Sequence, residues 1–124
     1  YKITGVEIDA EVIRFAKEYG YSNGVHFECR DAFEFVKNTT TSYDLICMDV
    51  FEQELIPHKF LDRNYLKMLK AKLNPGGVVL YNFYAYPKSV RDMGRWFFDR
   101  DIKKVFPNSE IVETSYNFIF CCRA

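Results

Sequence analysis

Short apolar runs alternate along this chain with longer stretches whose apolar residues recur at helical spacing. The first part of the chain is predicted to form two strands, residues 3–8 and 25–29, each followed by a helix. Asp9 and Asp31 stand where these helices need an N-cap, because an aspartate side chain accepts hydrogen bonds from the N–H groups of the first turn. Strands that alternate with helices in this way are typical of a parallel sheet covered by helices.

The rest of the chain continues this pattern and then departs from it. Residues 43–50 (YDLICMDV) form a nearly continuous apolar run that ends near an acid, as expected of a parallel strand that carries a side chain at its carboxyl edge. Five further elements follow: helices at 57–73 and 88–106, and strands at 78–85, 111–114 and 117–123. The last two strands are too close in sequence for a crossover, so they predict an antiparallel hairpin. We therefore expect an α/β fold with a mixed sheet.

Composition narrows the classes of function. We assign residues 1–124 to a single domain, because this length is usual for one domain and is enough to bury a core. Lysine plus arginine and aspartate plus glutamate balance at 17 each, so we expect a small-molecule partner and neither nucleic acid nor a membrane. Aromatic residues make up 18% of the chain, so some should line a pocket or a subunit contact.

The cysteines and the apolar runs indicate a cellular setting. The four cysteines lack paired CxxC spacing, so we expect reduced, buried thiols and no metal site; they are Cys29, Cys47, Cys121 and Cys122. No apolar run is long enough to span a bilayer and we recognise no leader sequence, so we expect a soluble, cytoplasmic protein.

Four acids are predicted at or just beyond the carboxyl ends of strands, where a ligand binds in an open α/β sheet: Glu7, Asp9, Asp31 and Asp49. Glu7 lies in an otherwise apolar strand, where an unpaired carboxylate is costly to bury. It should therefore accept hydrogen bonds from the ribose hydroxyls of a nucleoside, or else pair with a basic side chain. Asp9 is explained more simply as a helix cap.

Two of these acids, Asp31 and Asp49, each have a structural and a functional explanation. Asp31 begins a helix, and a cap residue beside exposed backbone N–H groups can also meet an adenine edge. Asp49 ends the most hydrophobic strand, where desolvation would suit it to general base catalysis; otherwise it caps a loop. The next strand ends in Tyr81, Asn82, Tyr84 and Tyr86. Alternation along that strand sends some of these side chains toward the pocket and others into helix packing.

Four motifs, taken together, resemble the spermidine-synthase-like branch of the class I methyltransferase superfamily. They are VEIDAEVI (6–13), RDAFEFV (30–36), YDLICMDVF (43–51) and LNPGGVVLYNF (73–83). The resemblance implies a Rossmann-like methyltransferase sheet with a C-terminal antiparallel hairpin. The family's first strand and glycine-rich loop have no counterpart before Tyr1. We therefore expect a fragment that lacks its first strand, or a chain that completes its sheet as a dimer.

The resemblance also implies how a nucleoside binds. Glu7, with Ile8 beside it, would bind the ribose of S-adenosylmethionine or its decarboxylated form. Asp31, with the backbone of Ala32, would hold the adenine. Asp49 would contact the nucleoside as well.

On the same resemblance, Asp49 would orient and deprotonate an attacking amine. The second acid of the family's motif falls on Glu52, but Gln53 replaces the proline that follows it in the family. The function implied is aminopropyl transfer to a small-molecule amine, with methyl transfer as the alternative that the altered segment favours. A non-catalytic Rossmann-like module and a nicotinamide dinucleotide domain are further alternatives. The C-terminal hairpin argues against the latter, which would continue with parallel strands.

Overall fold

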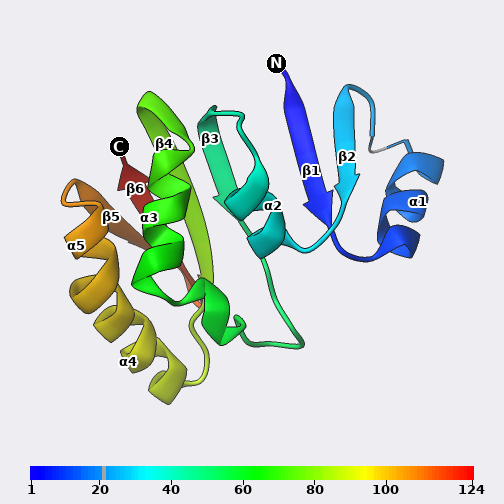
Figure 1. Ribbon diagram of the computed structural model, residues 1–124. Helices are drawn as coiled ribbons and strands as arrows, with labels where there is room; N and C mark the ends of the chain where they lie inside the picture. Colours follow the sequence, from blue (N-terminus) through cyan, green and yellow to red (C-terminus); the bar gives the residue numbers. More distant parts are fainter. Residues whose placement is uncertain (21) are drawn as a thin grey trace. The chain divides into compact units, whose positions relative to one another are not determined.

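The computed structural model describes residues 1–20 and 22–124, which form two compact parts. Residues 1–39 are the first part and residues 40–124 the second, and each is described by itself. Figure 1 traces both from the blue N-terminus to the red C-terminus. In each part, strands alternate with helices as the sequence pattern predicts. The assignment of the whole chain to one domain stays a prediction.

Two parallel strands form the sheet of the first part. Its elements are β1 (Ile3–Glu7), α1 (Ala10–Glu18), β2 (Val25–Cys29) and α2 (Ala32–Asn38). Asp9 caps α1 by accepting a backbone N–H of its first turn over 2.8 Å. Asp31 caps α2 by accepting two such N–H groups, over 2.8 and 3.1 Å. The predicted N-cap roles of both aspartates are confirmed.

A mixed sheet of four strands forms the second part, in the order β3–β4–β6–β5. Its elements are β3 (Tyr43–Met48), η1 (His58–Phe60), α3 (Arg63–Ala71), β4 (Leu73–Tyr84), α4 (Lys88–Phe97), η2 (Phe98–Ile102), α5 (Lys103–Val105), β5 (Ser109–Glu113) and β6 (Asn117–Arg123). β3 and β4 are parallel, whereas β6 is antiparallel to both β4 and β5. The predicted C-terminal antiparallel hairpin is therefore confirmed.

Several predicted boundaries differ from the structure, and two differences change an element. The helix predicted over residues 57–73 is broken, because Asp62 accepts the N–H of Asn64 over 2.6 Å and starts α3 as a new helix. The turn predicted at residues 74–77 lies inside β4. Tyr43 pairs with Leu73 and the next paired residue of β3 is opposite Val78, so the intervening residues bulge from the ladder.

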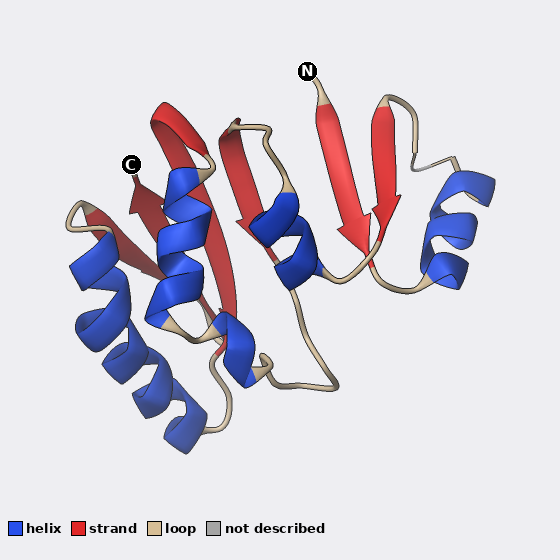
Figure 2. Cartoon of the chain, viewed as in Figure 1, coloured by secondary structure: helices blue, strands red, loops and turns tan. Residues whose placement is uncertain are grey.

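The core of the second part lies on one face of its sheet. Figure 2 shows α3 and α4 in front of the strands, on this face. The fully buried large side chains are Tyr65, Tyr81, Phe60, Phe106, Phe118, Phe120, Leu66, Leu69, Ile102, Val79 and Cys122. Gly94 allows α4 to come close to the sheet, since a Cβ there would meet the Phe83 ring at 2.7 Å. The opposite face of β3 carries the exposed side chains of Leu45 and Cys47.

The prediction of buried thiols is only partly right. All four cysteines are free, but Cys29 and Cys47 are exposed, Cys121 is half-buried and Cys122 is buried. Alternation along the strands explains the difference between the last two, because neighbouring residues point to opposite faces. Burial raises the pKa of the Cys122 thiol to about 12. Within the described residues, every helix is too short or too polar to cross a bilayer.

Candidate functional site

The carboxyl ends of β1 and β2 are level with each other. Glu7 ends β1 and is the register partner of Cys29, which ends β2. The backbone N–H of Arg30 then donates to the carbonyl of Glu7 over 3.0 Å. Asp31 is the next residue, so the structure brings Glu7 and Asp31 to one edge of this sheet, as predicted.

Glu7 is braced by its own turn. Its Oε1 accepts the backbone N–H of Asp9 over 2.9 Å, and the side chain is half-buried. A carboxylate can accept about four hydrogen bonds, so this contact does not exhaust its capacity. Ile8 is 67% exposed directly beside it. The edge thus combines a hydrogen-bond acceptor for the hydroxyls of a nucleoside with an apolar side chain for its rings.

Asp49 follows β3 at the carboxyl edge of the second sheet. Met48, the last residue of β3, pairs with Tyr81 of β4, which sets Asp49 level with Asn82. The Nδ2 group of Asn82 donates to Oδ1 of Asp49 over 2.8 Å. The prediction that Asp49 is desolvated is wrong for the described chain, because the residue is exposed. β3 lies at the edge of its sheet, so nothing in this part shields the residue after its last one.

Alternation divides the end of β4 between the core and the site, as predicted. Tyr81 is buried on the helix-covered face, where its hydroxyl donates to the carbonyl of Phe60 over 3.0 Å. Burial raises the pKa of Tyr81 well above its ordinary value, so this phenol is not a candidate base. Asn82 and Tyr84 point to the opposite face.

The loop after Asp49 makes a tight turn. The N–H of Glu52 donates to the carbonyl of Leu55 over 2.8 Å, and the N–H of Leu55 donates to the carbonyl of Glu52 over 3.2 Å. Gln53 has a φ of 57° in this turn. Proline is fixed near a φ of about −65°, so a proline at this position could not form the turn. The loop therefore takes a path at Gln53 that the proline expected from the resemblance could not adopt.

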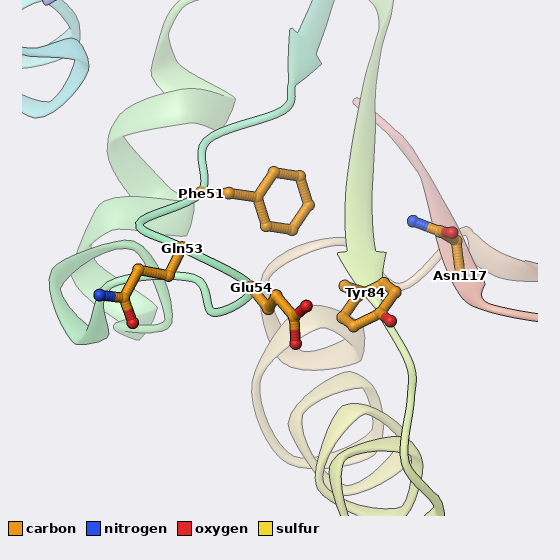
Figure 3. A pocket seen from close by; sticks show the side chains of 5 residues that line it. All are labelled: Phe51, Gln53, Glu54, Tyr84 and Asn117. Atoms are coloured by element: carbon orange, nitrogen blue, oxygen red, sulfur yellow. The ribbon is translucent and has the colours of Figure 1, made fainter.

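This turn carries Glu54 into a hollow of about 300 Å³. The lining residues are Phe51, Gln53, Glu54, Tyr84 and Asn117. Figure 3 shows the Glu54 carboxylate directed toward the Tyr84 ring. An adjoining hollow of about 450 Å³ is also lined by Glu54, together with Leu55, Tyr86, Pro87 and Val90. Among the described residues, Glu54 and not Glu52 is the acid that lines both hollows.

Sequence reasoning missed two residues of this edge, Glu54 and Asn117. Asn117 begins β6, and its Nδ2 group donates to Oδ1 of Asn82 over 2.8 Å. Its polarity in an otherwise apolar strand was a usable signal. Glu54 gave no comparable signal, because its position depends on the conformation of the turn.

Comparison with known proteins decides the family. The family model described as spermine/spermidine synthase domain matches residues 1–112. The chain belongs to the spermine/spermidine synthase family. Its predicted fold class is confirmed.

Two relatives in the spermine/spermidine synthase family illustrate the similarity. Spermine synthase from Saccharomyces cerevisiae is 33% identical over 129 residues, which cover 90% of this chain and 41% of the yeast protein. The polyamine aminopropyltransferase from Vibrio vulnificus is 32% identical over 89 residues, which cover 67% of this chain and 30% of that protein. The chain thus spans less than half the length of these relatives.

Solved structures show the same fold as this spermine/spermidine synthase domain. A probable spermidine synthase from Corynebacterium glutamicum superposes with a TM-score of 0.81 at 24% identity, covering 97% of this chain and 46% of that one. Human methyltransferase-like protein 13, solved in complex with SAH, superposes with a TM-score of 0.77 at 24% identity, covering 97% of this chain and 60% of that one. Both have the Rossmann-like methyltransferase architecture.

Proposed function

We propose that this chain is part of an aminopropyltransferase, which transfers the aminopropyl group of decarboxylated S-adenosylmethionine to a small-molecule amine. The observation that carries the proposal is the family match over residues 1–112. Glu7 and Asp49 support it, because they stand at the carboxyl ends of parallel strands.

The proposed nucleoside site uses the edge of the first sheet. Glu7 accepts hydrogen bonds from the ribose hydroxyls, and the exposed Ile8 side chain packs against the nucleoside. Asp31 and the backbone of Ala32, at the start of α2, hold the adenine. Glu7 is already fixed by the N–H of Asp9, so its carboxylate needs little reordering when the nucleoside binds.

The proposed reaction is an in-line displacement at the carbon next to the sulfonium. The lone pair of the amine nitrogen forms the new carbon–nitrogen bond while the carbon–sulfur bond breaks and methylthioadenosine leaves. Asp49 orients the amine and accepts the proton that the nitrogen loses. Correct placement of amine and sulfonium supplies much of the acceleration.

The acceptor amine is proposed to extend into the hollow beside Tyr84. Amines of this kind are cations at neutral pH, and a carboxylate with an adjacent aromatic ring attracts such a group. Glu54 and Tyr84 provide these two features. We therefore assign the distal ammonium of the acceptor to Glu54, although the second acid of the family's motif falls on Glu52.

The test is transfer of a labelled aminopropyl group by the full-length protein, with putrescine and spermidine as acceptors. Asp49→Asn should lower kcat roughly a hundredfold or more, because the proton acceptor is lost. Asp44→Asn is the matched control, since Asp44 lies at the other end of the same strand and should leave kcat unchanged. No transfer by the wild-type protein to either amine would contradict the proposal.

Binding separates the role of Glu7 from that of Asp49. Calorimetry with methylthioadenosine should show that the wild-type protein and Asp49→Asn both bind it. Glu7→Gln should bind it with an affinity lower by a factor of roughly ten or more. Glu11→Gln is the control, because Glu11 is an exposed acid of α1 that pairs with Arg14. Equal affinity of Glu7→Gln and Glu11→Gln would remove Glu7 from the site.

Methyl transfer is the second candidate, and the loop after Asp49 is the observation that favours it. Gln53 occupies a conformation that the family's proline cannot adopt, so the acceptor side of the site is altered. With S-adenosylmethionine labelled in the methyl group, a methylated product would establish this alternative. Absence of label from every product, with aminopropyl transfer present, would exclude it.

A further inference from the structure

Three polar side chains, which we call the relay, link β6 to the end of β3: Asn117, Asn82 and Asp49. Asn117 donates from Nδ2 to Oδ1 of Asn82 over 2.8 Å, and Asn82 donates from Nδ2 to Oδ1 of Asp49 over 2.8 Å. An ionised carboxylate can only accept hydrogen bonds, so Asn82 must turn its amino group toward Asp49. Its carbonyl oxygen then faces Asn117 and needs a donor, which Asn117 supplies. The direction of both hydrogen bonds in the relay therefore follows from the charge of Asp49.

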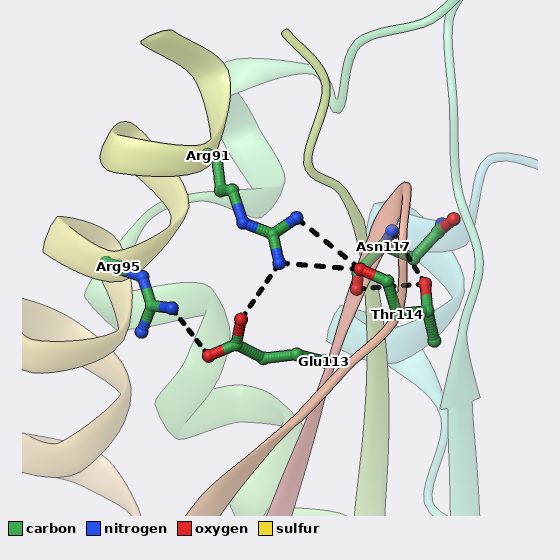
Figure 4. Close-up of polar contacts among 5 residues, drawn as sticks. All are labelled: Arg91, Arg95, Glu113, Thr114 and Asn117. Carbon is green, nitrogen blue, oxygen red and sulfur yellow. Dashed lines mark hydrogen bonds and ion pairs between the residues drawn. The ribbon is translucent and has the colours of Figure 1, made fainter. Parts of the chain in front are cut away.

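The turn before β6 fixes Asn117 through its backbone. The N–H of Asn117 donates to Oγ1 of Thr114 over 2.9 Å, and the N–H of Thr114 donates to the carbonyl of Asn117 over 2.9 Å. Figure 4 shows Arg91 reaching from α4 to this turn, where it contacts the Thr114 carbonyl and the Glu113 carboxylate. The Asn117 end of the relay is thus anchored to α4, a helix of the core.

We propose that Asn82 and Asn117 are positioning residues for Asp49: Asn117 fixes the orientation of the Asn82 amide, and Asn82 engages Oδ1 of Asp49 and leaves Oδ2 to the substrate. The catalytic meaning of this relay rests on the proposed function. The relay itself is a property of the second part of the chain, and its thermodynamic signature can be measured without any substrate.

The decisive variant is Asn117→Asp, which is nearly isosteric but cannot donate a hydrogen bond. The Asn82 amide then lies between two carboxylates and can turn its amino group toward only one of them, so its carbonyl oxygen faces the other with no proton between them and Asp49 no longer has an uncontested donor. In the full-length protein the variant should lower Tm by about 2–4 °C. It should also lower kcat roughly tenfold or more, with little change in KM for the sulfonium substrate, because Asp49 is misplaced while the nucleoside site is intact.

A second substitution tests the relay against a purely local defect. Asp49→Asn introduces a donor at residue 49, so both hydrogen bonds of the relay can reverse their direction in the double variant. Asn117→Asp should therefore lower Tm only slightly when Asp49→Asn is already present. Residues 117 and 49 make their contacts through Asn82, so the relay predicts this recovery.

The same pair of residue types occurs at the other end of the β3–β4 pair and supplies the control. Asn74 donates from Nδ2 to Oδ1 of Asp44 over 2.8 Å. Asn74→Asp makes the same chemical change as Asn117→Asp, away from the proposed site, and should leave kcat unchanged. A fall in kcat of equal size in both variants would mean a general electrostatic effect and would overturn the proposal.

The outcomes separate the relay from the proposed function. If Asn117→Asp lowers Tm equally with and without Asp49→Asn, the relay does not exist and the proposal fails. If Tm recovers but kcat of Asn117→Asp equals that of the wild-type protein, the contact is only structural and the proposal also fails. If Tm recovers and the wild-type protein transfers no aminopropyl group, the relay stands and the proposed function is what fails.

Discussion

Arg63 of α3 donates a hydrogen bond from Nε to Oδ1 of Asp101, 38 residues later in the chain, over 3.1 Å. Arg100 binds the other oxygen of the same carboxylate. Asp101 is almost completely buried, whereas the two arginine side chains are 46% and 47% exposed. The carboxylate therefore ties α3 to the helical segment after α4 while its two partners stay in contact with water.

The first prediction concerns the removal of this shared acceptor. Asp101→Ala should lower the free energy of unfolding of the full-length protein by about 2–3 kcal/mol, because two charged hydrogen bonds are lost. The cost should stay below that of a fully buried unpaired charge, since both guanidinium groups can regain water. Urea denaturation measures this change in the free energy of unfolding. Asp99→Ala is the control and should cost about 0.5 kcal/mol or less, because Asp99 forms an exposed pair with Lys103.

The second prediction concerns the close approach of α4 to the sheet. Alanine normally stabilises an exposed helix interior relative to glycine by about 1 kcal/mol. Gly94→Ala should instead destabilise the protein by about 1–2 kcal/mol, because its Cβ would meet the Phe83 ring at 2.7 Å. Thermal denaturation gives the sign of the change. Phe83→Leu in the same protein should relieve part of the added cost, and stabilisation by Gly94→Ala alone would contradict the packing described.

The third prediction concerns pH. Hydrogen bonds from Arg95 and Arg91 hold the pKa of Glu113 below its ordinary value of 4.5. The native state therefore favours the ionised carboxylate, so this contact stabilises the protein above pH 4.5 and is lost as the pH falls through the lowered pKa. The difference in Tm between the wild-type protein and Glu113→Gln should be largest near pH 6–7 and shrink as the pH falls below 4.5 through the lowered pKa.

Glu110→Gln is the control for this pH series. Glu110 lies on the same strand and forms an exposed pair with Arg123. Its substitution removes the same charge without the double arginine contact, so it should change Tm less at every pH. A Tm difference for Glu113→Gln that grows as the pH falls would have the wrong sign and would contradict the ion pairs.

The fourth prediction concerns the buried thiol of Cys122. An increase of its pKa from 9.0 to about 12 lowers its thiolate fraction at pH 8 roughly a thousandfold, and burial blocks access as well. Iodoacetamide at pH 8 should therefore leave Cys122 unmodified in the native protein, as read by peptide mass spectrometry, and alkylate it in urea. Equal rates in both conditions would place this side chain on the surface.

Local signals predicted much of this structure. The caps at Asp9 and Asp31 were predictable because a cap is decided within three residues of sequence. β6 was predicted at its exact bounds, residues 117–123, because few residues separate it from the preceding strand. Such features need no knowledge of what packs against them.

Features that depend on distant partners were predicted less well. The helix predicted over residues 88–106 is divided into α4, η2 and α5, and its residues Met93 and Trp96 are 40% and 56% exposed. The helix presents Gly94 and Phe97 to the sheet, because the close approach at Gly94 rotates the buried stripe away from these bulkier residues. The sequence pattern alone does not predict this rotation of the helix.

The candidate site shows the same limit. Asp49 was predicted from the strand that it ends, but its partnership with Asn82 depends on the register between two strands. Asn117 joins them only because β6 runs antiparallel beside β4. These contacts arise from the sheet and cannot be read from any one segment.

The two faces of β4 and β6 serve separate purposes. Tyr81, Phe83 and Phe118 hold the helices on one face, while Asn82 and Asn117 emerge on the other. Natural variation can therefore change the polar side chains of the second face while the packing of the first face is kept. We expect related sequences to vary at the polar positions of β4 and β6 and to keep the alternate positions that pack against the helices.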